Sequence, residues 1–273
     1  MTGKPYSQDV HAIAVIGRGR WAKVYIDVLE SLSLPYQVVI VSKSGSLQEL
    51  QKHNRNIFFV SSIEELLSNH TVKMAIVVNS IRSHFDSAQE LINEGIPVLI
   101  EKPICLEESQ VNILYDKAHK QDICIMPALT FTQCSYIQNF SHIVSNCNEG
   151  PEKIIIEWAD PYGEIRYGDT KSYDFTISIV QDVIPHIWSI LSTVLDSTDI
   201  NFNIESCSIR RGGQYVKLTS RVNGISCDIF LERNAGSRRR FVSAKYKSFP
   251  KVELDFTKEP GTLNLKNQNS SGD

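Results

Sequence analysis

The sequence predicts an α/β fold, in which a parallel sheet wrapped by helices is followed by an α+β domain with a mainly antiparallel open sheet. Two observations carry this prediction. From Ala12 to about Pro127, short apolar runs alternate with longer amphipathic runs, which is the pattern of parallel strands connected by helices. After Ser145, one long helical segment precedes several segments of alternating polarity, which is typical of antiparallel strands.

In the first half, each apolar run has the length of a strand and each following run has helical spacing. Ser62 and Glu65 have the spacing of a capping box at the start of one helix, and Gly95 is placed to end the next. The expected strands are 12–17, 36–42, 56–62, 72–80, 98–103 and 123–131, and the expected helices are 21–32, 62–70, 83–95 and 108–122.

In the second half, the segment 176–195 is the expected helix. The expected strands are 153–162, 201–211, 213–223, 225–233 and 240–246. We assign residues 1–127 to the first domain and 128–273 to the second, and we expect the polar stretch 145–152 to be a linker.

Composition excludes several classes of function. The 28 basic and 31 acidic residues leave a formal net charge of -3, so the chain has no positive electrostatic potential that would attract nucleic acid or an acidic membrane. The one dense basic run, "SRRRF" at 237–241, is expected to be a solvated strand or turn. The chain has no apolar stretch of about 20 residues and no signal-like start, so we expect a cytoplasmic protein that acts on a small molecule.

The cysteines predict no metal or redox centre. All six are scattered without a CxxC pair, so we expect reduced and mostly buried thiols and no metal site.

A glycine turn follows the first expected strand. In "AVIGRGRWAKVY", Gly17 would permit a tight turn, Gly19 would let the backbone approach a pyrophosphate, and Ala22 would fill the packing position. The start of the next helix would offer free N–H groups to the phosphates. We therefore predict a dinucleotide-binding Rossmann domain, in which Arg18 and Arg20 also reach phosphate or adenine.

The end of the second expected strand indicates which dinucleotide is preferred. An acidic residue there would hold the ribose hydroxyls of NAD, but the chain has Ser42, Lys43 and Ser44 instead. A cation flanked by hydroxyls suits a 2′-phosphate, so NADP is favoured and NAD stays possible. The alternative is that Lys43 is an ordinary solvated loop lysine.

The stretch "GIPVLIEKPI", 95–104, ends a buried strand in two charges and a proline. Together with the glycine turn and "NSIRSHFDSA", it resembles the Gfo/Idh/MocA family, named for glucose-fructose oxidoreductase and inositol dehydrogenase. The resemblance implies that Lys102 lies beside the nicotinamide and the reacting oxygen of the substrate. The cofactor-binding residues that we predict are Gly17, Arg18, Gly19, Arg20, Trp21, Ser42, Lys43, Ser44, Asn79, Ser80, His84, Glu101 and Lys102.

The resemblance also implies an aspartate and a histidine four residues apart, which "QDVIPH" matches with Asp182 and His186. This spacing places both side chains on one face of a helix. The chain departs from the family pattern at Pro185 and lacks the glycine-rich lead-in, and a proline inside a helix removes one backbone hydrogen bond. Taken alone, a histidine in the apolar run "VIPHIWSIL" is a packed core residue more often than a catalyst.

Lys102, His186 and Asp182 form a workable catalytic set. Histidine can hold or release a hydroxyl proton near neutral pH, and lysine can stabilise negative charge on oxygen. Asp182 would orient the imidazole or bind a substrate hydroxyl. The segment 158–175 offers aromatic and hydroxyl groups for a polar ring, and from it we take Trp158, Tyr162 and Tyr173 as substrate-binding residues. An ordinary loop at the sheet edge is the equal alternative.

The sequence thus predicts an NAD(P)-dependent oxidoreductase that moves hydride to or from a carbon bearing oxygen, in a sugar, sugar nucleotide or cyclitol. One alternative is an imine (C=N) reductase of a biosynthetic pathway. Another is a non-catalytic dinucleotide-binding regulatory protein. An open antiparallel sheet leaves a face or edge to cover, and the resemblance implies a homo-oligomer, dimer or tetramer, through it.

Overall fold

The computed structural model describes residues 11–43, 56–166, 169–170 and 173–266. Contacts divide the chain into two compact units, Met1–Ala128 and Leu129–Asp273. Each unit has its own sheet and its own apolar core, and each is described by itself. None of the helices in the described ranges combines the length and apolarity that a bilayer crossing requires.

The first unit contains a six-stranded parallel sheet in the order β3-β2-β1-β4-β5-β6. This order is that of the doubly wound dinucleotide-binding fold, in which ligands bind at the carboxyl ends of the strands. The strands are β1 (His11–Ile16), β2 (Gln37–Val41), β3 (Ile57–Val60), β4 (Thr71–Val77), β5 (Val98–Ile100) and β6 (Ile125–Pro127). The expected parallel sheet is confirmed.

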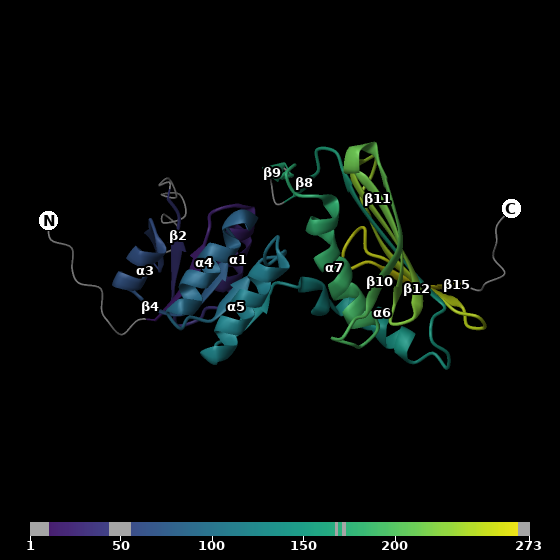
Figure 1. Ribbon diagram of the computed structural model, residues 1–273, viewed down its shortest axis with the longest axis horizontal. Helices are drawn as coiled ribbons and strands as arrows, with labels where there is room; N and C mark the ends of the chain where they lie inside the picture. Colours follow the sequence, from purple (N-terminus) through teal and green to yellow (C-terminus); the bar gives the residue numbers. More distant parts are fainter. Residues whose placement is uncertain (1–10, 44–55, 167–168, 171–172, 267–273) are drawn as a thin grey trace. The chain divides into compact units, whose positions relative to one another are not determined.

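Helices cover both faces of this sheet (Figure 1). The helices are α1 (Arg20–Ser31), α3 (Ile63–Asn69), α4 (Ile81–Asn93) and α5 (Glu108–Lys120). Apolar side chains of α1 pack on one face, and those of α3, α4 and α5 pack on the other. The central strand β1 is buried on both sides, which explains why its sequence is an unbroken apolar run.

The second unit contains a seven-stranded open sheet in the order β10-β11-β12-β7-β13-β14-β15. All neighbours are antiparallel except β12 and β7, so the expected mainly antiparallel sheet is confirmed. The strands are β7 (Lys153–Pro161), β10 (Phe202–Arg210), β11 (Tyr215–Val222), β12 (Ile225–Ala235), β13 (Arg239–Lys245), β14 (Lys251–Asp255) and β15 (Thr262–Lys266). A small pair, β8 (Ile165–Arg166) and β9 (Asp169–Thr170), lies apart from this sheet.

Helices α6 (Ser135–Ser145) and α7 (Ile179–Val194) pack on one face of this sheet (Figure 1). Helix α7 continues through Pro185, although a proline inside a helix costs about 3 kcal/mol. Burial offsets this cost, because Val183, Ile187 and Ile190 are at most 2% exposed and each such side chain contributes about 1.5–3 kcal/mol. The expected helix therefore forms in spite of its proline.

Two expectations from the sequence are wrong. The segment 145–152 is no linker between the domains, because it lies inside the second unit, where Glu149 accepts hydrogen bonds from the backbone N–H groups of Ser248 and Phe249. The cysteines were expected to be mostly buried, but of the six only Cys227 is.

Candidate active site

The turn between β1 and α1 brings two backbones into close contact. Gly17 has a φ of +132°, and a Cβ there would lie 2.9 Å from backbone atoms of Val78 and Asn79. At Gly19 a Cβ would meet nothing within 4 Å, so the space in front of this residue is open. No side chain caps the start of α1, which leaves its first N–H groups to an anion. Ala22 is fully buried, as its packing position requires.

A cavity of about 880 Å³ opens at the carboxyl ends of β1, β2, β3 and β4. It is lined by seven of the residues predicted to bind the cofactor, namely Gly17, Arg18, Gly19, Ser42, Lys43, Asn79 and Ser80. Five others do not belong to its lining, namely Arg20, Trp21, His84, Glu101 and Lys102. Ser44 lies outside the described residues. The glycine turn and the end of β2 therefore face one volume large enough for a dinucleotide.

Three carboxylates that the sequence analysis missed also line this cavity, namely Glu64, Asp86 and Glu90. A hydrogen bond with Ser62 and, more weakly, the charge of Lys43 hold the pKa of Glu64 below its usual value. Burial, and then the charge of Glu64, raises the pKa of Glu90. Sequence spacing gave no signal for these residues, because they come from helices that meet only when the sheet has formed.

The charged end of β5 is partly buried. Glu101 is 7% exposed, and its carboxylate accepts hydrogen bonds from the hydroxyl of Tyr25 at 3.0 Å and from the backbone N–H of Lys102 at 3.1 Å. Burial raises the pKa of Glu101, and burial together with the charge of Glu101 raises that of Tyr25. Glu101 thus links β5 to α1 and fixes the backbone that carries Lys102.

His84 joins the ends of two strands. Its ring is 3% exposed, with Nδ1 3.0 Å from the carbonyl oxygen of Pro103 and Nε2 3.2 Å from that of Asn79. Burial lowers the pKa of His84. Because a neutral imidazole has one N–H, it donates to one of these oxygens at a time. His84 therefore holds the turn after β4 against the turn after β5.

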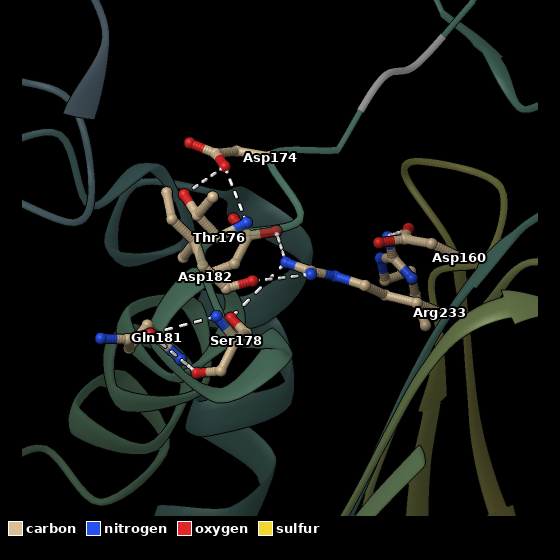
Figure 2. Close-up of polar contacts among 9 residues, drawn as sticks. Asp160, Asp174, Thr176, Ser178, Gln181, Asp182 and Arg233 are labelled. Atoms are coloured by element: carbon tan, nitrogen blue, oxygen red, sulfur yellow. Dashed lines mark hydrogen bonds and ion pairs between the residues drawn. The ribbon is translucent and has the colours of Figure 1, made fainter. Parts of the chain in front are cut away.

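In the second unit, the start of α7 is fixed by a capping box and by an arginine from β12 (Figure 2). Ser178 and Gln181 exchange the two hydrogen bonds of the box. Arg233 donates to the carbonyl oxygen of Ile177 at 2.8 Å and to Oδ2 of Asp182 at 3.1 Å. The arginine side chain is 10% exposed and that of Asp182 is 28% exposed. Asp182 is thus oriented by a strand that lies far from it in the sequence.

The ring of His186 lies against a stack of aromatic groups. It is parallel to the indole of Trp158, with ring centres 5.0 Å apart and planes 17° apart, and it meets the edge of Phe131 at 5.2 Å. The guanidinium of Arg240 lies 3.7 Å from the Trp158 ring and is paired with Asp160. Trp158 is 5% exposed, so the stack fixes the plane of the imidazole from within the core.

The expectation of a solvated strand or turn at 237–241 holds only in part, because Ser237 is exposed but all three arginines pair with carboxylates. Arg238 pairs with Glu164 at 2.7 Å, and Arg239 pairs with Glu157 at 2.8 Å. Arg240 is 1% exposed. These residues face carboxylates on β7 and on the segment after it, and sequence composition alone could not show these partners.

The two predicted tyrosines differ in environment. Tyr162 follows β7 and is 83% exposed. The ring of Tyr173 lies 5.1 Å from the guanidinium of Arg233, and burial, followed by the charges of Asp160 and Glu164, raises its pKa. Tyr173 therefore shares one cluster with Asp182, while Tyr162 is open to solvent.

Each unit thus brings together part of the predicted set. The first carries the cavity at the glycine turn, the buried carboxylate of Glu101, and Lys102. The second carries Asp182, His186, Trp158 and Tyr173 around Arg233 and Arg240. A parallel sheet with a glycine turn and an open cavity at its carboxyl ends defines a nucleotide-binding class of protein.

Comparison with known families identifies the first unit. Residues 11–129 match the model of an oxidoreductase family with an NAD-binding Rossmann fold, the Gfo/Idh/MocA family. This match, which covers the first unit, confirms the resemblance found in that part of the sequence.

Two curated relatives match parts of the chain. An uncharacterized oxidoreductase of Synechocystis is 26% identical over 148 residues, which are 54% of this chain and 40% of the relative. The myo-inositol dehydrogenase Hyg17 of Streptomyces leeuwenhoekii is 22% identical over 111 residues, which are 41% of this chain and 34% of the relative. The chain therefore spans less than half the length of either relative in these matches.

Solved structures share the fold over nearly the whole chain. KijD10, a 3-ketoreductase from Actinomadura kijaniata in complex with TDP-benzene and NADP, has a TM-score of 0.77 at 13% identity, with 96% of this chain and 82% of that chain covered. The UDP-N-acetylglucosamine 3-dehydrogenase GnnA from Acidithiobacillus ferrooxidans has a TM-score of 0.68 at 17% identity, with 93% and 79% covered. At such identities the likeness concerns the fold.

Proposed function

We propose that this protein is an NAD(P)-dependent oxidoreductase, which transfers hydride between the nicotinamide and a carbon bearing oxygen. The observation that best supports the proposal is the cavity of about 880 Å³ at the glycine turn. Gly17 allows the turn to pack on β4, and the open space before Gly19 admits a pyrophosphate to the start of α1. The residues therefore fit a dinucleotide.

NADP is the preferred dinucleotide in this proposal. Ser42 and Lys43 line the cavity at the end of β2, where a 2′-phosphate would meet a cation and a hydroxyl. The structural neighbour KijD10 has NADP bound, which supports the same preference. When bound, the nicotinamide supplies or accepts the hydride, and the protein supplies alignment and electrostatics.

Lys102, His186 and Asp182 act in the same reaction. The ammonium of Lys102 stabilises negative charge that develops on the substrate oxygen. His186 takes or returns the hydroxyl proton, and the stack on Trp158 fixes the plane of its ring. Asp182 orients the imidazole or a substrate hydroxyl, and its own orientation comes from Arg233.

The substrate is a sugar, a sugar nucleotide or a cyclitol. Support comes from a relative and neighbours that are named as a myo-inositol dehydrogenase, a UDP-N-acetylglucosamine 3-dehydrogenase and a 3-ketoreductase. Residues 1–127 would bind the dinucleotide and 128–273 the substrate. The hydroxyls of Tyr162 and Tyr173 are suited to a polar ring, while the buried indole of Trp158 contributes by holding His186.

The second unit also mediates a homo-oligomer, dimer or tetramer, in this proposal. Both α6 and α7 pack on one face of its sheet. The opposite face carries a hollow of about 390 Å³ whose lining includes Glu157, Phe230 and Arg239. Light scattering of the purified protein should give at least twice the mass of one chain, and a monomer at micromolar concentration would contradict this part of the proposal.

The first experiment is a fluorescence titration with NADPH and NADH. We expect binding of both, tighter for NADPH, and a selective loss of NADPH affinity in Lys43→Ala. Failure of both cofactors to bind would overturn the proposal. Equal affinities that Lys43→Ala leaves unchanged would overturn only the preference for NADP.

With a substrate found among sugars, cyclitols and imines, Lys102→Ala and His186→Ala should each lower kcat by on the order of 10²-fold, the scale expected for a positioned acid-base or electrostatic group. Lys120→Ala, on the exposed end of α5, is the matched control. If both active-site variants lose less than a few-fold, the catalytic assignment is wrong. Turnover of imines alone would assign the protein to C=N reduction.

A further inference from the structure

The wall of the dinucleotide cavity carries charges of both signs near the end of β2. Strand β3 is the parallel neighbour of β2, and the backbone N–H of Ser42 donates to the carbonyl oxygen of Val60 at 3.0 Å. The carboxyl ends of β2 and β3 therefore lie next to each other at the edge of the sheet. Lys43 follows β2, and Glu64 lies in the first turn of α3, the helix after β3; both line the cavity.

The adjacent residues Glu64 and Glu65 on α3 have different surroundings. The carboxylate of Glu65 accepts hydrogen bonds from the backbone N–H of Ser61 at 2.7 Å and from its hydroxyl at 2.6 Å, so its charge is occupied within its own turn. Glu64 has a hydrogen bond with Ser62, but unlike Glu65 it lines the cavity, where it is exposed to solvent. Its pKa is held below the usual value, so it is ionised at neutral pH. Glu64 thus presents a full negative charge to whatever lies beside Lys43.

The negative charge of Glu64 would change the affinities for NADP and NAD in opposite directions. The 2′-phosphate of NADP is a phosphate monoester, which carries roughly −1.5 to −2 charges near neutral pH. Lys43 attracts this group, and Glu64 repels it and also competes for Lys43. NAD has a ribose hydroxyl at the same atom, which can donate to a carboxylate. The ratio of the two affinities therefore depends on both side chains together.

We propose that Glu64 is a specificity-determining residue of the cofactor site, which opposes Lys43 and limits the preference for NADP over NAD. The inference rests on the proposed binding of a dinucleotide in this cavity. Two carboxylates on α4, Asp86 and Glu90, line the same cavity, but they come from the helix after β4. The effect belongs to Glu64 because it follows β3, the strand that pairs with β2.

The test is the ratio of the dissociation constants of NADH and NADPH, measured by fluorescence titration of the full chain in low salt. Glu64→Gln should raise this ratio about threefold to tenfold, the range expected for exposed charge pairs that act on a multiply charged group. NADPH should bind more tightly, and NADH should bind equally or more weakly. The gain should shrink in 0.5 M NaCl, because salt screens exposed charges.

Two variants serve as controls. Asp116→Asn removes a carboxylate from the exposed side of α5, and Asp27→Asn removes one from the exposed side of α1; both make the same change of net charge as Glu64→Gln. Each should leave the ratio within twofold of the wild type. The urea midpoint of unfolding checks that Glu64→Gln folds. We expect little change in this midpoint, because a glutamine in the first turn keeps the size of the side chain and loses only its charge.

The outcomes separate the two proposals. A ratio that Glu64→Gln leaves within twofold, while both cofactors bind, overturns the role of Glu64 and leaves the proposed function in place. An equal shift in Asp27→Asn or Asp116→Asn also overturns it, because the effect would then be one of net charge. Absence of binding by either cofactor to the wild type overturns both.

Discussion

The dinucleotide cavity of the first unit and the arginine cluster of the second are built in different ways. The cavity is lined mainly by short turns that follow neighbouring parallel strands, such as Gly17–Gly19 and Ser42–Lys43. The cluster joins Arg240 to Asp160 and Arg233 to Asp182 across long stretches of chain, and its side chains are largely buried. The polar groups of the cavity wall are therefore expected to matter little for stability, while those of the cluster are tied to the core.

The largest expected effect tests the buried pair of the cluster. The side chains of Arg240 and Asp160 are 1% and 3% exposed. Arg240→Met would leave the carboxylate buried without its arginine, so we expect the free energy of unfolding to fall by about 3–5 kcal/mol in a urea titration. The double variant Arg240→Met, Asp160→Leu should recover much of this loss, since an apolar pair of similar size replaces the ions.

Arg221→Met is the matched control for the cluster. Arg221 pairs with Glu205 at 2.8 Å, but the two side chains are 56% and 42% exposed. Solvent screens such a pair, so the expected loss is below about 1 kcal/mol. Equal losses in Arg240→Met and Arg221→Met would show that burial is not what distinguishes the cluster.

The next effect tests the glycine turn of the cavity. Gly17→Ala would place a Cβ 2.9 Å from the backbone of β4 at a φ that side chains rarely adopt. We expect a loss of about 2–3 kcal/mol in stability together with the loss of NADPH binding. Gly19→Ala should change stability by less than about 1 kcal/mol, because its φ is −69° and the space is open, yet it should weaken NADPH binding. Equal destabilisation by both changes would contradict the division of roles between the two glycines.

The smallest effect concerns the buried carboxylate of the first unit. Burial raises the pKa of Glu101 in the folded protein, so its contribution to stability is complete below the pKa of the unfolded chain and is lost as the pH rises through the folded-state value. Compared with wild type, Glu101→Gln should therefore become relatively more stable from pH 5 to pH 8, by about 1 kcal/mol or less. Differential scanning calorimetry at several pH values measures this, and a difference that is independent of pH would show that Glu101 does not titrate as described.

Much of the first unit could be predicted, because its signals are local. The apolar run 12–16, the turn at Gly17 and the cap at Ser62 each act within a few residues, and the structure places them as expected. The carboxylate of Glu65 departs from the expected box, since it reaches Ser61 and not the N–H of Ser62. Helix α7 was also predictable, and burial of its apolar side offset the proline that made its backbone uncertain.

The arginine cluster could not be predicted in this way. The run 237–241 carries the composition of a solvated strand, but the register of β13 beside β7 places Arg240 next to Trp158 on the helix-covered face. A shift by one residue would have exposed it, because side chains alternate between the faces of a sheet. The same limit applies to Glu64, whose neighbour Lys43 is defined by the pairing of β2 with β3.

The sequence by itself determined the fold class, the glycine turn and the family resemblance of the first unit, because hydrophobic periodicity and turn residues act over short stretches of chain. The tertiary structure alone decided the partners of its buried charges. Tyr25 meets Glu101, Arg233 meets Asp182 and Arg240 meets Asp160 only after strand order and register are set. Such contacts join residues 51 to 80 positions apart, a distance over which sequence spacing carries no geometric information.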